Sequence, residues 1–297
     1  MPDTEVWTIG RLLNWTTEYL AGRGSTSARL DTELLLAEAC GCERIELYTT
    51  FDTPASDATR LTFRELVQRR AEGMPVAHLL GRRDFYSLTF HVTPAVLIPR
   101  PETELLVVTL LDLVSTRDGQ GGAAASKLRI ADVGTGSGIL AVCAARHIAS
   151  ASVTAIDISD AALEVARRNA REHEVADRID FFESDLFDSV PATEPYDFIL
   201  SNPPYVAENE TELLSPEVRD YEPREALFAG PTGVEVIERL VPQAAERLAA
   251  GGALLLEISP MIEDRVAALF DGDAAWQRQA TIKDLAGLPR VVVARKT

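Results

Sequence analysis

The sequence predicts an α/β fold with a mostly parallel sheet, covered by helices on both faces and preceded by a small helical bundle. Three observations indicate this class. Residues 1 to 75 carry helical periodicity, and the chain beyond Lys127 alternates strand and helix patterns. A glycine-rich loop also separates the first of these strands from a helix, as in nucleotide-binding folds. With 297 residues, the chain is long enough for one large and one smaller domain.

The N-terminal part, residues 1–80, should contain three or more short helices. Apolar residues recur at helical spacing after Thr8, which is placed to cap the first helix. A second helical pattern covers Arg29 to Cys40, and a third spans roughly Ala58 to Glu72. These patterns predict a separate helical bundle domain.

Residues 81–100 are expected to form a β-hairpin linker, because apolar side chains alternate from Tyr86 to Val92. An apolar helix is predicted from Leu105 to Val114. The following segment, Ser115 to Ser126, is rich in glycine and alanine and has no periodic apolar face. It is therefore expected to be a mobile surface loop.

The remainder of residues 101–297 should form one large domain with seven strands. Helical stretches such as Asp160 to Glu172 and Val234 to Ala249 separate most of them, and parallel strands need crossovers of this kind. The candidate strands are Leu128–Val133, Val153–Asp157, Ile179–Phe182, Asp197–Ser201, Ala253–Ile258, Gln277–Ile282 and Val291–Ala294.

Composition excludes several classes of protein. The formal net charge of −17 and the lack of a Lys/Arg tract argue against duplex DNA as the primary partner. The three cysteines and four histidines show no ligand spacing, so no metal is expected. No targeting signal or membrane-length apolar run is visible, which leaves a cytoplasmic protein as the expectation.

The glycine-rich loop is the first candidate binding site. Its glycines let the backbone approach a ligand at a helix N-terminus, where a dinucleotide could bind, so an NAD-dependent oxidoreductase is one alternative. The acid before the loop would instead repel phosphate and suit a cationic ligand such as S-adenosylmethionine, which has an ammonium, a sulfonium and no phosphate. The candidate cofactor-binding residues at this loop are Asp132, Gly134, Thr135, Gly136, Ser137 and Gly138.

Two further strand ends could contact the same ligand. Asp157 stands 19 residues after Gly138, the spacing at which a carboxylate meets ribose hydroxyls in a βαβ site. Its structural alternative is capping of the next helix, which Ser159 can do itself. Asp185 and Leu186 could flank an adenine. Alternatively, Asp185 could be an ordinary residue of the loop surface and Leu186 an ordinary core residue.

The most informative stretch is Asn202-Pro203-Pro204-Tyr205, directly after a predicted strand. The two prolines fix φ and remove two backbone donors, so the Asn202 side chain and the backbone carbonyls are presented in one stiff arrangement. The Tyr205 ring can then cover a planar group held there. An ordinary turn after a strand is the alternative reading.

Taken together, these motifs resemble the class I S-adenosylmethionine-dependent methyltransferases that modify planar nitrogens, with a Rossmann-like, seven-stranded sheet. One such family methylates adenine N6 in nucleic acid. The other is the HemK/PrmC-type protein-glutamine N5-methyltransferases of peptide chain release factors. Segments across nearly the whole chain resemble this second family: Pro75–Gly81, Asp84–Tyr86, Val96–Glu104, Tyr221–Leu227 and Lys283–Gly287.

The resemblance implies methylation of the glutamine in the Gly-Gly-Gln motif of a release factor, with S-adenosyl-L-homocysteine as the other product. Asn202 and Pro203 would accept the amide hydrogens and Tyr205 would cover the amide, with Asn202 also facing the cofactor. Pro204, Arg100 and Glu102 would help to bind substrate, and residues 1–80 would dock the factor. We expect a monomer that binds nucleic acid poorly. An adenine-N6 methyltransferase and a non-catalytic S-adenosylmethionine-binding interaction protein remain alternatives.

Three positions depart from the family pattern: His78 where tyrosine is usual, Leu186 where an aromatic residue is common, and Ser259 where a glycine-containing turn is common.

Overall fold

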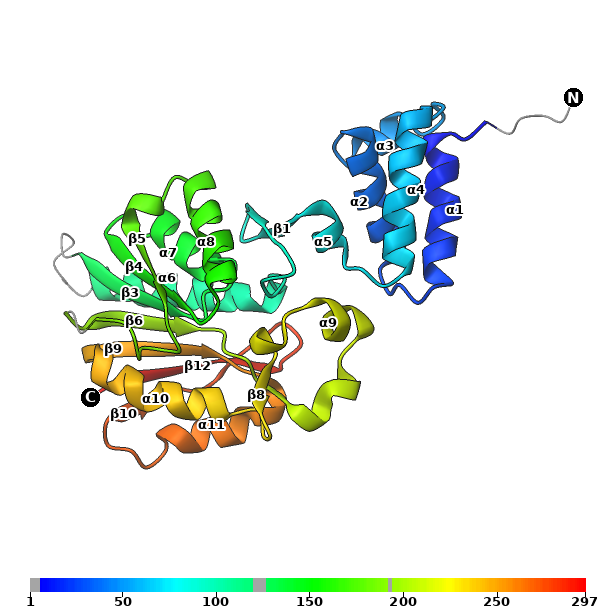
Figure 1. Cartoon of the computed structure of the whole chain (residues 1–297). Helices are drawn as coiled ribbons and strands as arrows, with labels where there is room; N and C mark the ends of the chain where they lie inside the picture. Colours follow the sequence, from blue (N-terminus) through cyan, green and yellow to red (C-terminus); the bar gives the residue numbers. More distant parts are fainter. Residues whose placement is uncertain (1–5, 120–126, 192–193) are drawn as a thin grey trace, which may run out of the picture. The chain divides into compact units, whose positions relative to one another are not determined.

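The computed structural model describes residues 6–119, 127–191 and 194–297. The chain divides into two compact units, Met1–Gly81 and Arg82–Thr297 (Figure 1). The three-part division into residues 1–80, 81–100 and 101–297 stays a prediction. In the structure, the hairpin of β1 (Arg82–Phe85) and β2 (Leu88–His91) forms as expected, and Phe85 and Phe90 join the core of the second unit.

The first unit is a helical bundle, as predicted. Thr8 caps its first helix by accepting a hydrogen bond from the Arg11 backbone nitrogen at 3.2 Å. Fully buried leucines, among them Leu13 and Leu35, pack in its centre. Two short helices, α3 and α5, were not foreseen because each is too short to show a helical period. The helices are α1 (Ile9–Ala21), α2 (Ala28–Cys40), α3 (Glu46–Thr49), α4 (Asp57–Ala71) and α5 (Val76–Leu80).

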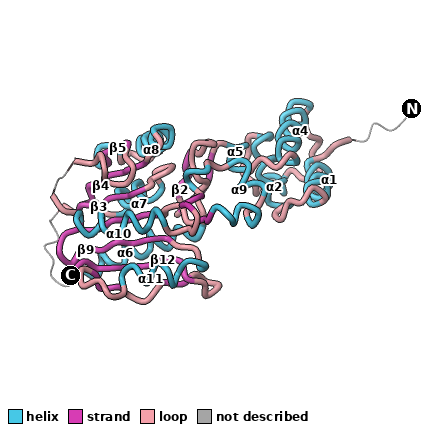
Figure 2. The backbone as a smooth tube through the Cα atoms, turned by 60° about the horizontal axis from the view of Figure 1, so that its bottom comes forward, coloured by secondary structure: helices cyan, strands magenta, loops and turns pink. Residues whose placement is uncertain are grey.

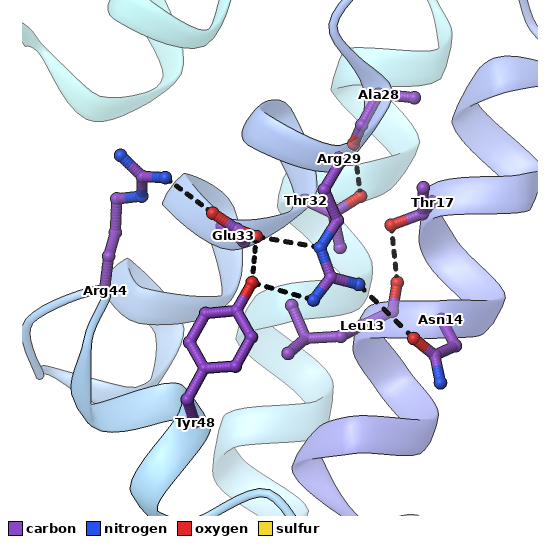
Figure 3. Close-up of polar contacts among 9 residues, drawn as sticks. All are labelled: Leu13, Asn14, Thr17, Ala28, Arg29, Thr32, Glu33, Arg44 and Tyr48. Atoms are coloured by element: carbon purple, nitrogen blue, oxygen red, sulfur yellow. Dashed lines mark hydrogen bonds and ion pairs between the residues drawn. The ribbon is translucent and has the colours of Figure 1, made fainter.

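A polar cluster around Glu33 joins α2 to α3 and the turn before it (Figure 3). The Glu33 carboxylate accepts hydrogen bonds from Arg29 Nε (2.8 Å), Arg44 Nη2 (2.6 Å) and the Tyr48 hydroxyl (2.5 Å). Burial alone would raise the pKa of Glu33, but these three donors outweigh it and lower the pKa to about 2. The cluster therefore keeps a buried carboxylate ionised.

The second unit is built on one mostly parallel sheet, whose strands are magenta in Figure 2. Five strands run parallel, while β12 and β10 extend the sheet antiparallel at one edge, and short β11 pairs with β12. The order is β10 (Trp276–Arg278), β12 (Pro289–Lys296), β9 (Leu248–Glu257), β6 (Tyr196–Ser201), β3 (Leu128–Val133), β4 (Ala151–Asp157) and β5 (Ile179–Glu183), with β11 at Ile282–Lys283.

Helices cover both faces of this sheet. Because strand side chains alternate, Ile130 joins one apolar cluster with α6 and α7, whereas Ala131 joins another with α10 and α11. The α/β class predicted from the sequence is confirmed. The helices are α6 (Glu104–Gly119), α7 (Ile139–His147), α8 (Asp160–Glu172), α9 (Pro216–Tyr221), α10 (Glu235–Arg247) and α11 (Glu263–Phe270).

Some predicted boundaries were wrong. Helix α6 continues to Gly119, so Ser115 does not begin a loop; residues 120–126 lie outside the described part of the chain. The strand expected over Gln277–Ile282 is broken into β10 and β11. The connection after β6 contains a small sheet of β7 (Val206–Ala207) and β8 (Phe228–Gly230).

Candidate active site

The carboxyl ends of the parallel strands meet at one edge of the sheet. Val133 on β3 is paired with both Ile156 on β4 and Ser201 on β6, and Ser201 is paired with Leu256 on β9. The residues that follow these strands are therefore neighbours, as in other open α/β sheets. A cavity of about 700 Å³ opens there, and it is lined by both the glycine loop and the Asn202 segment.

The glycine loop presents backbone to this cavity. Gly134 and Gly136 have φ of +74° and +55°, and a Cβ at either would meet no atom within 4 Å. At Gly138, φ is +83° and a Cβ would lie 3.0 Å from that of Ala166, so glycine lets the start of α7 pack against α8. Thr135 and Ser137 are buried and also line the cavity.

Asp132 lies behind the loop and not on the cavity wall. It is fully buried, and its Oδ2 accepts hydrogen bonds from Thr135 Oγ1 (2.6 Å) and the Ala141 backbone nitrogen (3.0 Å). Burial raises its pKa to about 7, although both hydrogen bonds oppose the shift. The structure thus gives Asp132 a direct part in holding the loop, and its contact with a ligand stays a prediction.

Asp157 lines the cavity at the end of β4. Its two oxygens accept hydrogen bonds from the backbone nitrogens of Gly136 (2.8 Å) and Ser159 (3.0 Å). Ser159 itself caps α8 by accepting from Ala162. Because a carboxylate has further lone pairs, Asp157 can fix the loop and still accept hydrogen bonds from a ligand.

The segment after β5 also lies on the cavity wall. Leu186 is 8% exposed and adopts φ of +52°, an uncommon backbone conformation for leucine. The neighbouring Asp185 accepts a hydrogen bond from Arg239 Nη2 at 2.6 Å. Sequence reasoning missed Arg239, which also lines the cavity.

The Asn202 segment forms a further part of the cavity wall. Asn202, Pro203 and Pro204 line the cavity, and the Asn202 Nδ2 atom donates to Thr103 Oγ1 at 3.2 Å. Tyr205 is outside the cavity lining. Burial raises the pKa of its phenol, and the charge of Glu257 adds to the shift. The predicted cover of an amide by the Tyr205 ring stays a prediction.

Arg100 lines the cavity and is held in place from a distant segment. Its Nη2 atom lies 2.5 Å from Glu222 Oε1, and Glu222 Oε2 accepts from the Ile98 backbone nitrogen at 3.0 Å. Burial raises the pKa of Glu222, against the opposing effect of Arg100. Glu102 is half-buried but does not line the cavity.

Three of these residues, Thr103, Glu222 and Glu257, were missed as individual positions. Thr103 and Glu222 belong to segments that carry the family resemblance, so their neighbours gave a signal. Glu257 ends β9, next to the strand that precedes Asn202, and an acid at the carboxyl end of a parallel strand was the available signal.

Two further properties concern the described residues alone. Across residues 6–119, 127–191 and 194–297, no three His, Cys, Asp or Glu side chains are grouped as a metal site. In the same ranges, no helix combines the length and apolar character needed to cross a bilayer.

Comparisons with known proteins agree with this geometry. A family model for the PrmC N-terminal domain matches residues 11–81, and one for the methyltransferase small domain matches residues 110–216. The 16S rRNA methyltransferase RsmC of T. thermophilus, solved in complex with AdoMet and guanosine, has a TM-score of 0.51 at 22% identity over 73% of this chain and 50% of that chain, which shows a shared fold.

Curated relatives match over almost the full length. A release factor glutamine methyltransferase of Rhodopirellula baltica is 44% identical over 98% of this chain and 97% of its own length. Another, from Geobacter sulfurreducens, is 39% identical over 98% of both chains. The chain therefore belongs to the release factor glutamine methyltransferase family.

Proposed function

We propose that this protein transfers a methyl group from S-adenosylmethionine to the side-chain amide nitrogen of the glutamine in a release factor's Gly-Gly-Gln motif. The observation that carries the proposal is one cavity lined by both the glycine loop and Asn202-Pro203-Pro204. Donor and acceptor could therefore meet in one place. Membership of the release factor glutamine methyltransferase family supports this choice of substrate.

The cavity fits S-adenosylmethionine. Its volume of about 700 Å³ is in the range of cofactor sites. The open space beside Gly134 and Gly136 would admit the methionine part of the ligand, Asp157 would accept hydrogen bonds from ribose hydroxyls, and Leu186 would pack on the adenine. When bound, the cofactor supplies an electrophilic methyl group on a sulfonium.

Asn202 would aim the substrate amide. Since its Nδ2 atom donates to Thr103, its Oδ1 atom is left to accept one amide hydrogen of the glutamine. The backbone carbonyl of Pro203 would accept the other. With both hydrogens held, the nitrogen lone pair can point at the methyl group instead of being delocalised into the amide carbonyl. Tyr205 would border this amide with its ring.

The first unit carries a stripe suited to a protein partner, which we call the α1 stripe: Trp7, Arg11, Trp15, Tyr19 and Arg23, at every fourth position. Trp15 is 52% exposed, stacks on Tyr19 at a ring separation of 5.2 Å and meets Trp7 edge-on at 6.1 Å. Arg11 and Arg23 lie over the outer rings. Tryptophan, tyrosine and arginine are enriched among interface residues that dominate binding. We propose that the α1 stripe docks the body of the release factor.

Replacing Trp15 tests this docking role. Trp15→Ala should raise KM for the intact factor about 10-fold or more while leaving S-adenosylmethionine binding unchanged. Leu61→Ala, which removes a 62% exposed apolar side chain from α4, is the matched control. Equal KM values for the Trp15 variant and the control would remove the stripe from docking.

The net charge of −17 supports action on a protein and not on nucleic acid.

We further propose that the enzyme works as a cytoplasmic monomer. Light scattering of the pure protein would show a molecular mass near 32.4 kDa if the monomer proposal holds and twice that mass if it fails.

A labelling experiment tests the proposed function. The protein is incubated with methyl-labelled S-adenosylmethionine and, in separate samples, a release factor, its variant lacking the Gly-Gly-Gln glutamine, and adenine-containing DNA. Label in the intact factor alone supports the proposal. Label in DNA or in the glutamine-free variant would contradict it.

A further inference from the structure

Three long polar side chains on one face of α10 hold the segment that follows β5. Arg239, Gln243 and Arg247 stand at every fourth position of this helix and therefore lie on one face, and we call them the α10 row. The segment that they contact is Ser184–Pro191, which we call the β5 loop. Leu186 in this loop lines the cavity. The row thus connects α10 to one wall of the proposed cofactor site.

The row binds the β5 loop on both sides of Leu186. On the preceding residue, the Asp185 carboxylate accepts a hydrogen bond from Arg239 Nη2 at 2.6 Å. On the following residue, the Phe187 backbone nitrogen donates to Gln243 Oε1 at 2.9 Å. Leu186 is therefore held between two contacts that come from successive turns of the same helix.

The rest of the β5 loop is bound in the same way. The other end of the Gln243 amide, Nε2, donates to Asp188 Oδ1 at 3.1 Å. Arg247 donates from Nη2 to the carbonyl of Val190 and from Nη1 to the carbonyl of Pro191, both at 2.9 Å. These contacts are directional, so they specify the path of the loop backbone and not only its attachment to the helix.

The backbone of Leu186 needs such support. Its φ of +52° lies in the left-handed region, which is unfavourable for leucine and persists only where the surroundings impose it. Phe187 and Val190 belong to the same apolar cluster as Leu240 of α10, and this packing attaches the loop to the helix. Because apolar burial is not directional, it does not select one backbone conformation. The hydrogen bonds to the neighbours of Leu186 can do so.

We propose that the α10 row is a set of positioning residues that holds Leu186 where its side chain borders the adenine of S-adenosylmethionine. This inference rests on the proposed function for the place of the adenine, and it adds a role for α10 in cofactor affinity. Gln243 and Arg247 do not line the cavity, so they act on the cofactor through the loop. Their loss should weaken cofactor binding and leave the transfer step unchanged.

Gln243→Leu tests this role, because leucine has a similar size and makes neither hydrogen bond. The dissociation constant of S-adenosyl-L-homocysteine, measured by calorimetry, should rise about 10-fold. The kcat at saturating S-adenosylmethionine should stay at the wild-type value. Arg239→Met removes a half-exposed ion pair and should raise the dissociation constant less, about 2- to 5-fold. Glu246→Leu, at an exposed position of α10, is the matched control and should bind as the wild type does.

A double-variant cycle separates positioning from a general loss of structure. Leu186→Ala removes the side chain that the row positions, so adding Gln243→Leu to it should raise the dissociation constant little further. Hydrogen exchange of the protein without cofactor gives a readout of the contact itself. The Phe187 amide hydrogen should exchange faster in Gln243→Leu than in the wild type.

An unchanged dissociation constant in Gln243→Leu, or an equal rise with and without Leu186→Ala, would overturn the positioning role. If Gln243→Leu does not fold, Arg239→Met carries the same test, and binding equal to that of Glu246→Leu would overturn it. If the wild type and the variants bind as expected but no release factor is labelled, the proposed substrate fails and the α10 row stands. A wild type that does not bind S-adenosyl-L-homocysteine would overturn both proposals.

Discussion

Two buried glutamates, one in each unit, occupy opposite electrostatic settings. Glu33 in the helical bundle is 5% exposed and receives hydrogen bonds from Arg29, Arg44 and Tyr48, which lower its pKa to about 2 (Figure 3). Glu257 at the end of β9 is 1% exposed, and burial raises its pKa to about 7 against the opposing effects of Thr103, Arg290 and Tyr205. The hydrogen-bond donors around Glu33 outweigh the effect of its burial on the pKa, whereas the groups around Glu257 do not.

The two shifts affect stability with opposite signs. Because the folded pKa of Glu33 is depressed, its contribution to stability is present above about pH 4.5 and is lost as the pH falls toward 2. Because the folded pKa of Glu257 is raised, the folded state loses stability as the pH rises from about 4.5 through 7. The bundle uses its glutamate to stabilise a fold, whereas the catalytic unit retains one that lowers its stability at neutral pH. A functional site is where such a loss is expected.

Asn202→Ala should have the largest effect, and this effect should be confined to the activity of the second unit. Loss of a preorganised acceptor at the reacting amide should lower methyl transfer about 100- to 1000-fold, while cofactor binding remains. Single-turnover transfer of labelled methyl to the release factor measures it. Asn14→Ala, at an exposed amide in the bundle, is the control. Near-normal turnover in Asn202→Ala would remove Asn202 from the mechanism.

Glu33→Gln should lower the stability of the helical bundle. Two of the three donors are partly exposed, which weakens their effect, so we expect a loss of about 2 kcal/mol in the free energy of unfolding at neutral pH. Urea unfolding followed over pH 3 to 8 measures it. The difference from wild type should shrink as the pH falls below about 4.5, and a constant difference would show that Glu33 does not act through its charge.

Tyr205→Phe should give the smallest change. The ring is retained, but one hydroxyl that favours the ionised carboxylate is lost, so the pKa of Glu257 should rise further. Urea unfolding followed over pH 4 to 8 measures it, because the loss of stability that accompanies ionisation of Glu257 should then extend to higher pH. A shift of this loss to lower pH would contradict the effect of the Tyr205 hydroxyl on Glu257.

Local sequence pattern predicted much of the fold. The strand Leu128–Val133 and the helix Asp160–Glu172 form over the predicted residues because each carries a full hydrophobic period and clear boundary residues. The hydrophobic pattern failed to predict elements that are short, such as α3. It also failed where the polar end of a helix shows no hydrophobic period, as in α6 up to Gly119.

The candidate site was also predicted only in part. Motifs placed the glycine loop, Asp157 and Asn202 on one cavity, because each directly follows a strand of the same sheet. Contacts between distant positions carry no such signal. Thr103 and Asn202 are 99 residues apart in sequence, and nothing local to either position shows that their side chains hydrogen-bond to each other.

Labelling of a release factor tests the proposed methylation most directly. We expect label from methyl-labelled S-adenosylmethionine in the intact factor, and we expect none in the variant factor that lacks the Gly-Gly-Gln glutamine. Equal labelling of the intact factor and the glutamine-free variant would contradict transfer to this glutamine.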